Sequence, residues 1–142
     1  MTVRVERSFE LPAERARVWE FIADPGKRAG AISVVTDYEV HDDGRATWQI
    51  RLPIPVVDST ITVETRDEEF RAPEYVKFSG RSKVMHVVGE HELTETEDGT
   101  TVSNRFVVDG RLPGVERFFR RNLDGEIGNL EAALLDYLGV ES

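Results

Sequence analysis

Glu126 is the residue whose position most clearly suggests chemistry. At 100° per residue, its direction lies within about 40° of the centre of an apolar stripe on a predicted helix over residues 115–138. A carboxylate directed into an apolar interior loses hydration and can serve as an acid, a base or a ligand anchor. The alternative is that Glu126 faces a water-filled cavity mouth and has no chemical role.

His91 is the second candidate, because it shares the inward face of a predicted strand with Gly89 and Leu93. An imidazole there could transfer protons or orient a polar ligand group. The alternative is a buried histidine with an ordinary hydrogen-bond partner. If His91 and Glu126 lie within hydrogen-bond reach, they form an acid–base pair.

Asn122, Asn104 and Arg7 are further polar residues on faces that we expect to be buried. Asn122 lies one turn before Glu126, and Asn104 lies on the last predicted strand. Each asparagine can donate a hydrogen bond to a ligand or satisfy nearby backbone. Arg7 either pairs with a carboxylate such as Glu126 or packs its stem while its head reaches water.

The sequence predicts neither a metal site nor a cofactor. His86 and His91 are five residues apart on one predicted strand, which places them on opposite faces, and His41 lies beside a predicted turn. The chain has no HExxH motif, no glycine-rich phosphate loop and no GxSxG motif. With no cysteine, disulfides and thiolate chemistry are excluded.

These residues are positioned by a run of predicted strands. Alternation with a period of two predicts strands over residues 2–10, 34–40, 46–52, 59–65, 87–93 and 102–108, and a further strand that begins at Val76. Asp42-Asp43-Gly44 and Glu97-Asp98-Gly99-Thr100 are typical hairpin turns. After the first strand, one short helix starts at Pro12 and ends at Asp24-Pro25-Gly26, and a second turn of helix covers residues 27–30.

After Leu112-Pro113-Gly114 the apolar period changes from 2 to 3.6, which predicts an amphipathic helix from Val115 to Leu138. Antiparallel strands joined by tight turns form a twisted sheet with one apolar face, and a long helix across that face buries both surfaces. We therefore predict a single α+β domain over residues 1–142. Its curved seven-stranded antiparallel sheet wraps around the C-terminal helix and leaves an opening for a ligand.

Composition excludes several classes of partner. The chain has 27 acidic and 18 basic residues and a net charge of −9, which is unfavourable for binding nucleic acid or an anionic membrane. Its first seven residues carry charges, and no apolar run approaches the length of about 20 residues that a membrane span needs. We expect an acidic, cytoplasmic protein.

The element order and several short segments resemble the SRPBCC superfamily, which includes START domains, polyketide cyclase/dehydrase-like proteins and plant Bet v 1-type carriers. The matching stretches are residues 9–14 and 18–25, Glu92-Leu93 before residues 98–102, and the terminal helix. The resemblance implies a helix-grip fold that binds lipids, polyketides or other apolar molecules, with catalysis in only some members.

Within this superfamily the chain is most similar to the carbon monoxide dehydrogenase G-like branch, through residues 23–25 and 106–114. That branch tends to carry a Pro-Gly turn where this chain has Ala31-Ile32-Ser33-Val34. The similarity implies an accessory contact with a molybdenum hydroxylase.

Three functional hypotheses follow. The first is binding of a small hydrophobic ligand without catalysis, in a pocket lined by Tyr38, Trp48, Phe78, His91, Asn104, Phe106, Phe119, Asn122, Leu123, Glu126 and Leu130. The second is a polyketide cyclase/dehydrase-like enzyme with Glu126 and His91 as acid and base. The third is an accessory protein, so the expected partners are the ligand and either a second copy of the chain or a larger enzyme.

Overall fold

The computed structural model describes residues 2–41, 44–54, 60–112 and 114–139, which form seven strands and three helices. The strands are β1 (Thr2–Leu11), β2 (Val35–Val40), β3 (Arg45–Ile50), β4 (Ile61–Arg71), β5 (Tyr75–Arg81), β6 (Met85–Thr96) and β7 (Gly99–Gly110). The helices are α1 (Arg15–Ile22), α2 (Pro25–Gly30) and α3 (Val115–Leu138). The strands make one antiparallel sheet in the order β1-β7-β6-β5-β4-β3-β2.

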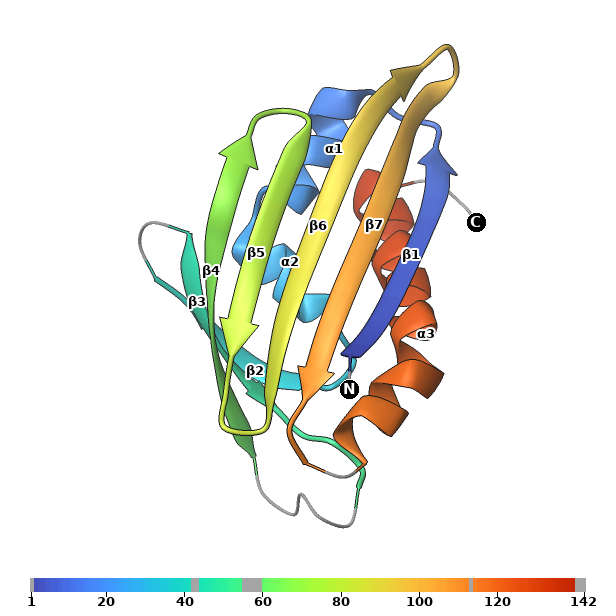
Figure 1. Cartoon of the computed structure of the whole chain (residues 1–142). Helices are drawn as coiled ribbons and strands as arrows, with labels where there is room; N and C mark the ends of the chain where they lie inside the picture. The colour runs from blue at the N-terminus through green and yellow to red at the C-terminus, as the bar shows by residue number, and fades with distance from the viewer. Residues whose placement is uncertain (1, 42–43, 55–59, 113, 140–142) are drawn as a thin grey trace.

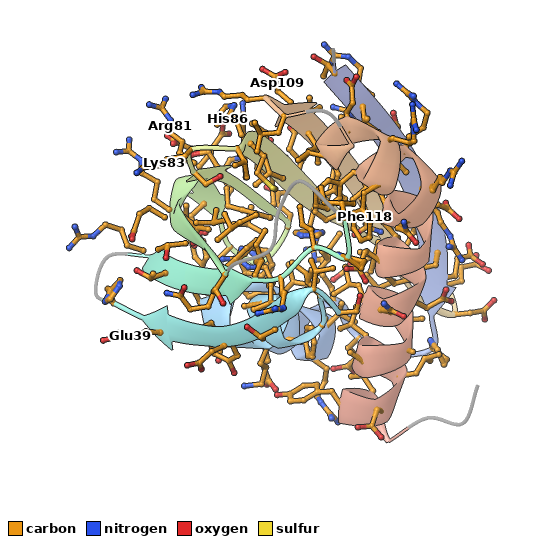
Figure 2. The ribbon with its side chains drawn as sticks, turned by 90° about the horizontal axis from the view of Figure 1, so that it is seen from below. Glu39, Arg81, Lys83, His86, Asp109 and Phe118 are labelled. Atoms are coloured by element: carbon orange, nitrogen blue, oxygen red, sulfur yellow. The ribbon has the colours of Figure 1, made fainter. Side chains whose placement is uncertain are left out.

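The sheet is strongly curved, and all three helices lie on its concave side (Figure 1). Viewed from below, the two ends of the sheet curl toward the helices, so that Arg81, Lys83 and His86 point away from the enclosed side (Figure 2). Twist accumulates along antiparallel strands, and register shifts in β2 and β4 add local bending. The predicted helix-grip fold, with two short helices after the first strand, is confirmed.

The two short helices differ in their starting points from the sequence prediction. Asp24 caps α2, because its carboxylate accepts hydrogen bonds from the backbone N–H of Gly26 at 2.8 Å and of Lys27 at 3.3 Å. Pro25 therefore begins α2 rather than only ending the helix before it. The first helix begins at Arg15, after an extended Glu14, and not at Pro12.

Helix α3 divides the core into two clusters. Near its N-terminus, Phe119 and Leu123 pack with side chains of β3 and β5. Near its C-terminus, Leu134 packs with residues of α1, including Ile22, and closes that end of the concave side. Phe118 lies on the side of α3 that faces the sheet (Figure 2).

Some details of the sequence prediction fall outside the described residues. These are Asp42 and Asp43 of one predicted turn, Ser59 of one strand and Pro113 before the long helix. The other predicted turn is confirmed, because Thr96 of β6 pairs with Gly99 of β7. Within the described part of the chain, no helix is long and apolar enough to cross a membrane.

Candidate functional site

A small cavity lies between the concave face of the sheet, α3 and the segment that joins α2 to β2. Its volume is about 50 Å³, and since one water needs about 10–15 Å³ on the same measure, a few waters would fill it. Most of the side chains in its wall are apolar. The opening predicted from the sequence is therefore largely filled by the side chains of the first core cluster.

Most of the predicted pocket residues lie in the wall of this cavity. They are Trp48, Phe78, His91, Phe106, Phe119, Leu123, Glu126 and Leu130. The remaining wall comes from residues that the sequence did not single out, chiefly Arg28 of α2 and the segment over residues 31–35.

Tyr38 and Asn122 lie outside the wall for different reasons. Tyr38 is 42% exposed and packs against α2, where a Cβ on Gly26 would come 3.1 Å from its ring. Helix α2 therefore occupies the space that we assigned to the pocket next to Tyr38. Asn122 lies on the exposed side of α3, and its amide donates to the backbone oxygen of Phe118 at 2.7 Å.

His91 is held in one orientation by Asn104, which lies behind it rather than in the cavity wall. The amide nitrogen of Asn104 donates to the backbone oxygens of Arg7 at 3.1 Å and Val102 at 3.4 Å. Its Oδ1 is therefore the acceptor for His91 Nδ1–H, at 2.8 Å. Burial lowers the pKa of His91 to about 4, although the bond to Asn104 opposes this shift. The imidazole is neutral at neutral pH, with a lone pair on Nε2.

Glu126 connects α3 to the segment between α2 and β2. The backbone N–H of Ser33 lies 3.2 Å from Oε1 and 3.1 Å from Oε2, and the Asn129 amide donates to Oε1 at 2.6 Å. Glu126 is buried against this segment. Among the described residues, no hydrogen bond joins Glu126 to His91, so this structure does not assemble the proposed acid–base pair.

Arg7 pairs with carboxylates other than Glu126. Its Nη1 lies 3.4 Å from Asp124 Oδ2, and its Nη2 lies 3.6 Å from Glu131 Oε1. The side chain is about one-third exposed, so these contacts form at the edge of the fold. Arg7 therefore pairs with carboxylates while its head reaches the surface, and Glu126 is not among its partners.

Arg28 is the cavity residue that sequence reasoning missed. Its side chain is 6% exposed, its Nη2 donates to Asp67 Oδ1 at 2.7 Å, and its guanidinium lies 5.4 Å from the centre of the Phe78 ring. Burial raises the pKa of Asp67, and the positive charge of Arg28 opposes that rise. Because α2 has only six residues, it shows no apolar stripe from which an inward position could be recognised.

Two hydrogen-bond donors of residues in this wall, Arg28 Nη1 and Trp48 Nε1, are buried. Neither Arg28 Nη1 nor Trp48 Nε1 has a hydrogen-bond partner among the residues that the structure describes. Leaving a buried donor unpaired costs about 1–3 kcal/mol. The wall therefore combines a large apolar area with unused hydrogen-bonding capacity.

Other surface features are weaker candidates for a functional site. A wider groove, open to solvent, is lined by charged residues that include Arg66, Glu68 and Arg81. Some of these charges already pair, as Arg66 Nε and Glu68 Oε1 do at 3.0 Å. In the described parts of the chain, no three His, Asp or Glu side chains gather closely enough to hold a metal ion.

A curved antiparallel sheet closed by a long C-terminal helix, with an apolar cavity between them, defines a helix-grip protein. The chain belongs to the family described as polyketide cyclase/dehydrase and lipid transport, whose model matches residues 2–135. No curated protein matches the sequence.

Several solved structures share the fold at low sequence identity. A conserved protein from Geobacillus kaustophilus is 14% identical with a TM-score of 0.78, over 96% of this chain and 95% of that one. The Zhui aromatase/cyclase from Streptomyces sp. R1128 is 15% identical with a TM-score of 0.68, over 96% and 91%. A START superfamily protein from Mycobacterium smegmatis is 10% identical with a TM-score of 0.71, over 92% and 93%. At these identities the likeness extends to the fold alone.

Proposed function

We propose that this protein binds a small, largely apolar molecule between the sheet and α3 and does not transform it. The observation that carries the proposal is the cavity, whose apolar wall is drawn from both α3 and the sheet. Burying apolar ligand surface against such a wall contributes about 25 cal/mol per Å². The family description and the aromatase/cyclase and START-type structures support a ligand-binding interior.

Binding requires the cavity to grow, since sites for drug-sized ligands occupy roughly 300–1,000 Å³ and this one measures about 50 Å³. The wall segment over residues 31–34 is neither helix nor strand. Individual turn-type backbone hydrogen bonds hold it, such as that from Arg51 N–H to the Val34 oxygen at 2.9 Å, whereas regular ladders and helical bonds hold the strands and α3. Ser33 in this segment is exposed, and its N–H bonds to Glu126. Outward movement of this segment is the route by which we expect a ligand to enter.

The side chains favour binding over proton transfer. A histidine with a pKa of about 4 is a weak base, and at neutral pH almost none of it is in the imidazolium form that acts as a general acid. Glu126 already accepts hydrogen bonds from Ser33 and Asn129. The cyclase/dehydrase-like enzyme remains the competing hypothesis, and the accessory role beside a molybdenum hydroxylase stays a prediction.

A fluorescence titration with the uncharged apolar probe N-phenyl-1-naphthylamine tests the proposal. We expect saturable binding by the wild-type protein and at least tenfold weaker binding by Leu123→Phe, because Leu123 lines the cavity and the added ring takes up its free space. Leu135→Phe is the matched control, because Leu135 lies on the same helix but packs in the other core cluster.

Equal probe binding by the two variants would overturn the cavity as the binding site. Mass spectrometry of the natively purified protein identifies any molecule that the cavity carries. If that molecule is converted to a product by the wild-type protein, and conversion is lost in both Glu126→Gln and His91→Ala, then the enzyme hypothesis replaces the binding one.

A further inference from the structure

The unpaired donors in the cavity wall indicate what kind of ligand fits. We propose that the ligand is an uncharged molecule whose apolar body carries a carbonyl-type acceptor oxygen, and that Arg28 Nη1 binds this oxygen. This inference rests on the proposed function and specifies the chemistry of the same cavity.

Arg28 supplies the primary donor. Its guanidinium has five N–H groups in a fixed planar arrangement, and Asp67 uses the Nη2 side at 2.7 Å. Nη1 is buried and has no acceptor within the described part of the protein. The ion pair with Asp67 and the contact with Phe78 fix the guanidinium beside the cavity. The guanidinium therefore needs little ordering of its own, and widening of the cavity is the step that would expose Nη1 to a ligand oxygen.

Trp48 supplies a second donor in the same wall. Its Nε1 is also buried and without an acceptor among the described residues. The Trp48 ring lies 5.8 Å from the Phe78 ring, the same ring that the guanidinium of Arg28 covers. A buried Trp N–H normally finds a partner. A second acceptor on the ligand, or a water molecule bound beside the ligand, would accept the hydrogen bond from Trp48 Nε1–H.

The charges around the cavity select a neutral acceptor over an anion. Asp67, which pairs with the positive charge of Arg28, is not itself part of the wall, and Glu126 supplies a carboxyl group to the wall. His91 contributes no charge at neutral pH, because burial lowers its pKa to about 4. A ligand carboxylate would add negative charge beside Asp67 and Glu126 in a poorly solvated space. A carbonyl oxygen uses the free donor without that penalty.

Three naphthalene probes of nearly the same shape separate these possibilities. They are 2-acetylnaphthalene, which carries a carbonyl, 2-isopropylnaphthalene, which is a hydrocarbon, and 2-naphthoate, which is an anion at neutral pH. Displacement of N-phenyl-1-naphthylamine from the wild-type protein measures their affinities. We expect the ketone to bind at least tenfold more tightly than either of the others.

The matched variant is Arg28→Met with Asp67→Asn, which removes the donor without leaving a buried carboxylate unpaired. In this double variant we expect the ketone-to-hydrocarbon affinity ratio to fall to about one, while the hydrocarbon still binds. Trp48→Phe removes the second donor together with one of the two fused rings. Because the space that this opens affects the ketone and the hydrocarbon alike, their affinity ratio still reports the donor and should fall partially. The wild-type comparison does not depend on the folding of either variant.

Failure of this inference differs from failure of the proposed function. If the ketone and the hydrocarbon bind the wild-type protein equally, the donors are met by water and the carbonyl proposal is wrong, although the cavity remains a binding site. If 2-naphthoate binds most tightly, the ligand class is an organic acid and the charge argument fails. If none of the three displaces the probe, the cavity itself is not a binding site.

Discussion

His91 experiences two opposing influences on its protonation. Burial among Phe78 and Phe106 removes water from the imidazole and favours its neutral form, while the hydrogen bond to Asn104 favours protonation. Burial has the larger effect, so the pKa falls from 6.5 to about 4. The folded protein therefore takes up a proton at His91 far less readily than the unfolded chain does.

This difference predicts a loss of stability in acid. Below about pH 6.5 the unfolded chain binds a proton at His91, and the folded protein does not do so until about pH 4. Unfolding is therefore favoured progressively as pH falls through this window, by on the order of 3 kcal/mol at its lower end. Urea unfolding of the wild-type protein at intervals from pH 7 to pH 4 measures the effect.

His91→Gln is the matched control, because glutamine can donate to Asn104 but does not titrate. Asp24 and Asp67, whose pKa values are also shifted, titrate alike in both proteins and cancel in the comparison. The variant should lose less stability than the wild type between pH 6.5 and pH 4. Parallel stability curves would show that His91 titrates normally in the folded state.

At the scale of elements, the segment over residues 31–34 is the part of the cavity wall that we propose moves when a ligand enters. The Ser33 N–H donates to Glu126 of α3, from 93 residues away in the chain. A hydrogen bond to a charged acceptor contributes about 1.5–3 kcal/mol. Glu126 is thus placed to set how often the segment opens.

Glu126→Ala should therefore speed exchange of the Ser33 amide with solvent at least tenfold and accelerate entry of N-phenyl-1-naphthylamine. The free energy of unfolding should fall by about 1–2 kcal/mol, since the lost bond is at a partly buried site. Hydrogen-exchange NMR and stopped-flow fluorescence provide the two measurements. Glu131→Ala, on the same helix and paired with Arg7 at the edge of the fold, should change neither rate. Unchanged Ser33 exchange in Glu126→Ala would rule out this role.

Substitutions at two glycines, one in crowded and one in open surroundings, test how tightly the sheet is packed beside the cavity. A Cβ at Gly89 of β6 would overlap the rings of Phe78 and Phe106, whereas a Cβ at Gly125 of α3 meets nothing within 4 Å. Gly89→Ala should destabilise the protein by about 1–3 kcal/mol, and Gly125→Ala should stabilise it by up to about 1 kcal/mol. Thermal unfolding measures both. A neutral Gly89→Ala would mean that the rings move aside freely.

The limits of secondary-structure elements were predicted well where the apolar pattern was long and poorly where it was short. Helix α3 spans 24 residues with one continuous apolar stripe, so its limits and inward face followed from periodicity. Helix α2 has six residues, and Pro25 is compatible both with the end of one helix and with the start of the next. Missing the extent of α2 placed Tyr38 in the cavity and left Arg28 out of it.

For the candidate site, the sequence predicted only the directions in which individual side chains point. The inward directions of Glu126 and His91 follow from the periods of helix and strand. The partner of Glu126 does not, because Ser33 meets it only through tertiary packing, and the same holds for the bond from Asn104 to the Arg7 backbone. No local signal in the sequence links residues so far apart in the chain.

At the scale of the whole molecule, electrostatics oppose the compact state. The formal charge of −9 is spread over a small domain, so the acidic residues repel one another. Among the ion pairs of the described residues, Arg28–Asp67 is the buried one, with side chains 6% and 10% exposed. Arg105–Glu6 is one of several pairs with exposed members, which solvent screens. We therefore expect the net repulsion to outweigh what the surface pairs contribute.

Salt should consequently stabilise this protein. Raising NaCl from 10 mM to 500 mM shortens the screening length from about 30 Å to about 4–5 Å, which suppresses repulsion across the whole surface. Weakening of the exposed ion pairs acts in the opposite direction but is smaller. We expect Tm to rise by a few degrees, since about 1 kcal/mol corresponds to about 2–5 °C in a domain of this size. Choline chloride should give the same rise if the effect is screening rather than binding of a cation. A Tm that falls with salt would show that the ion pairs, and not the net charge, dominate the surface electrostatics.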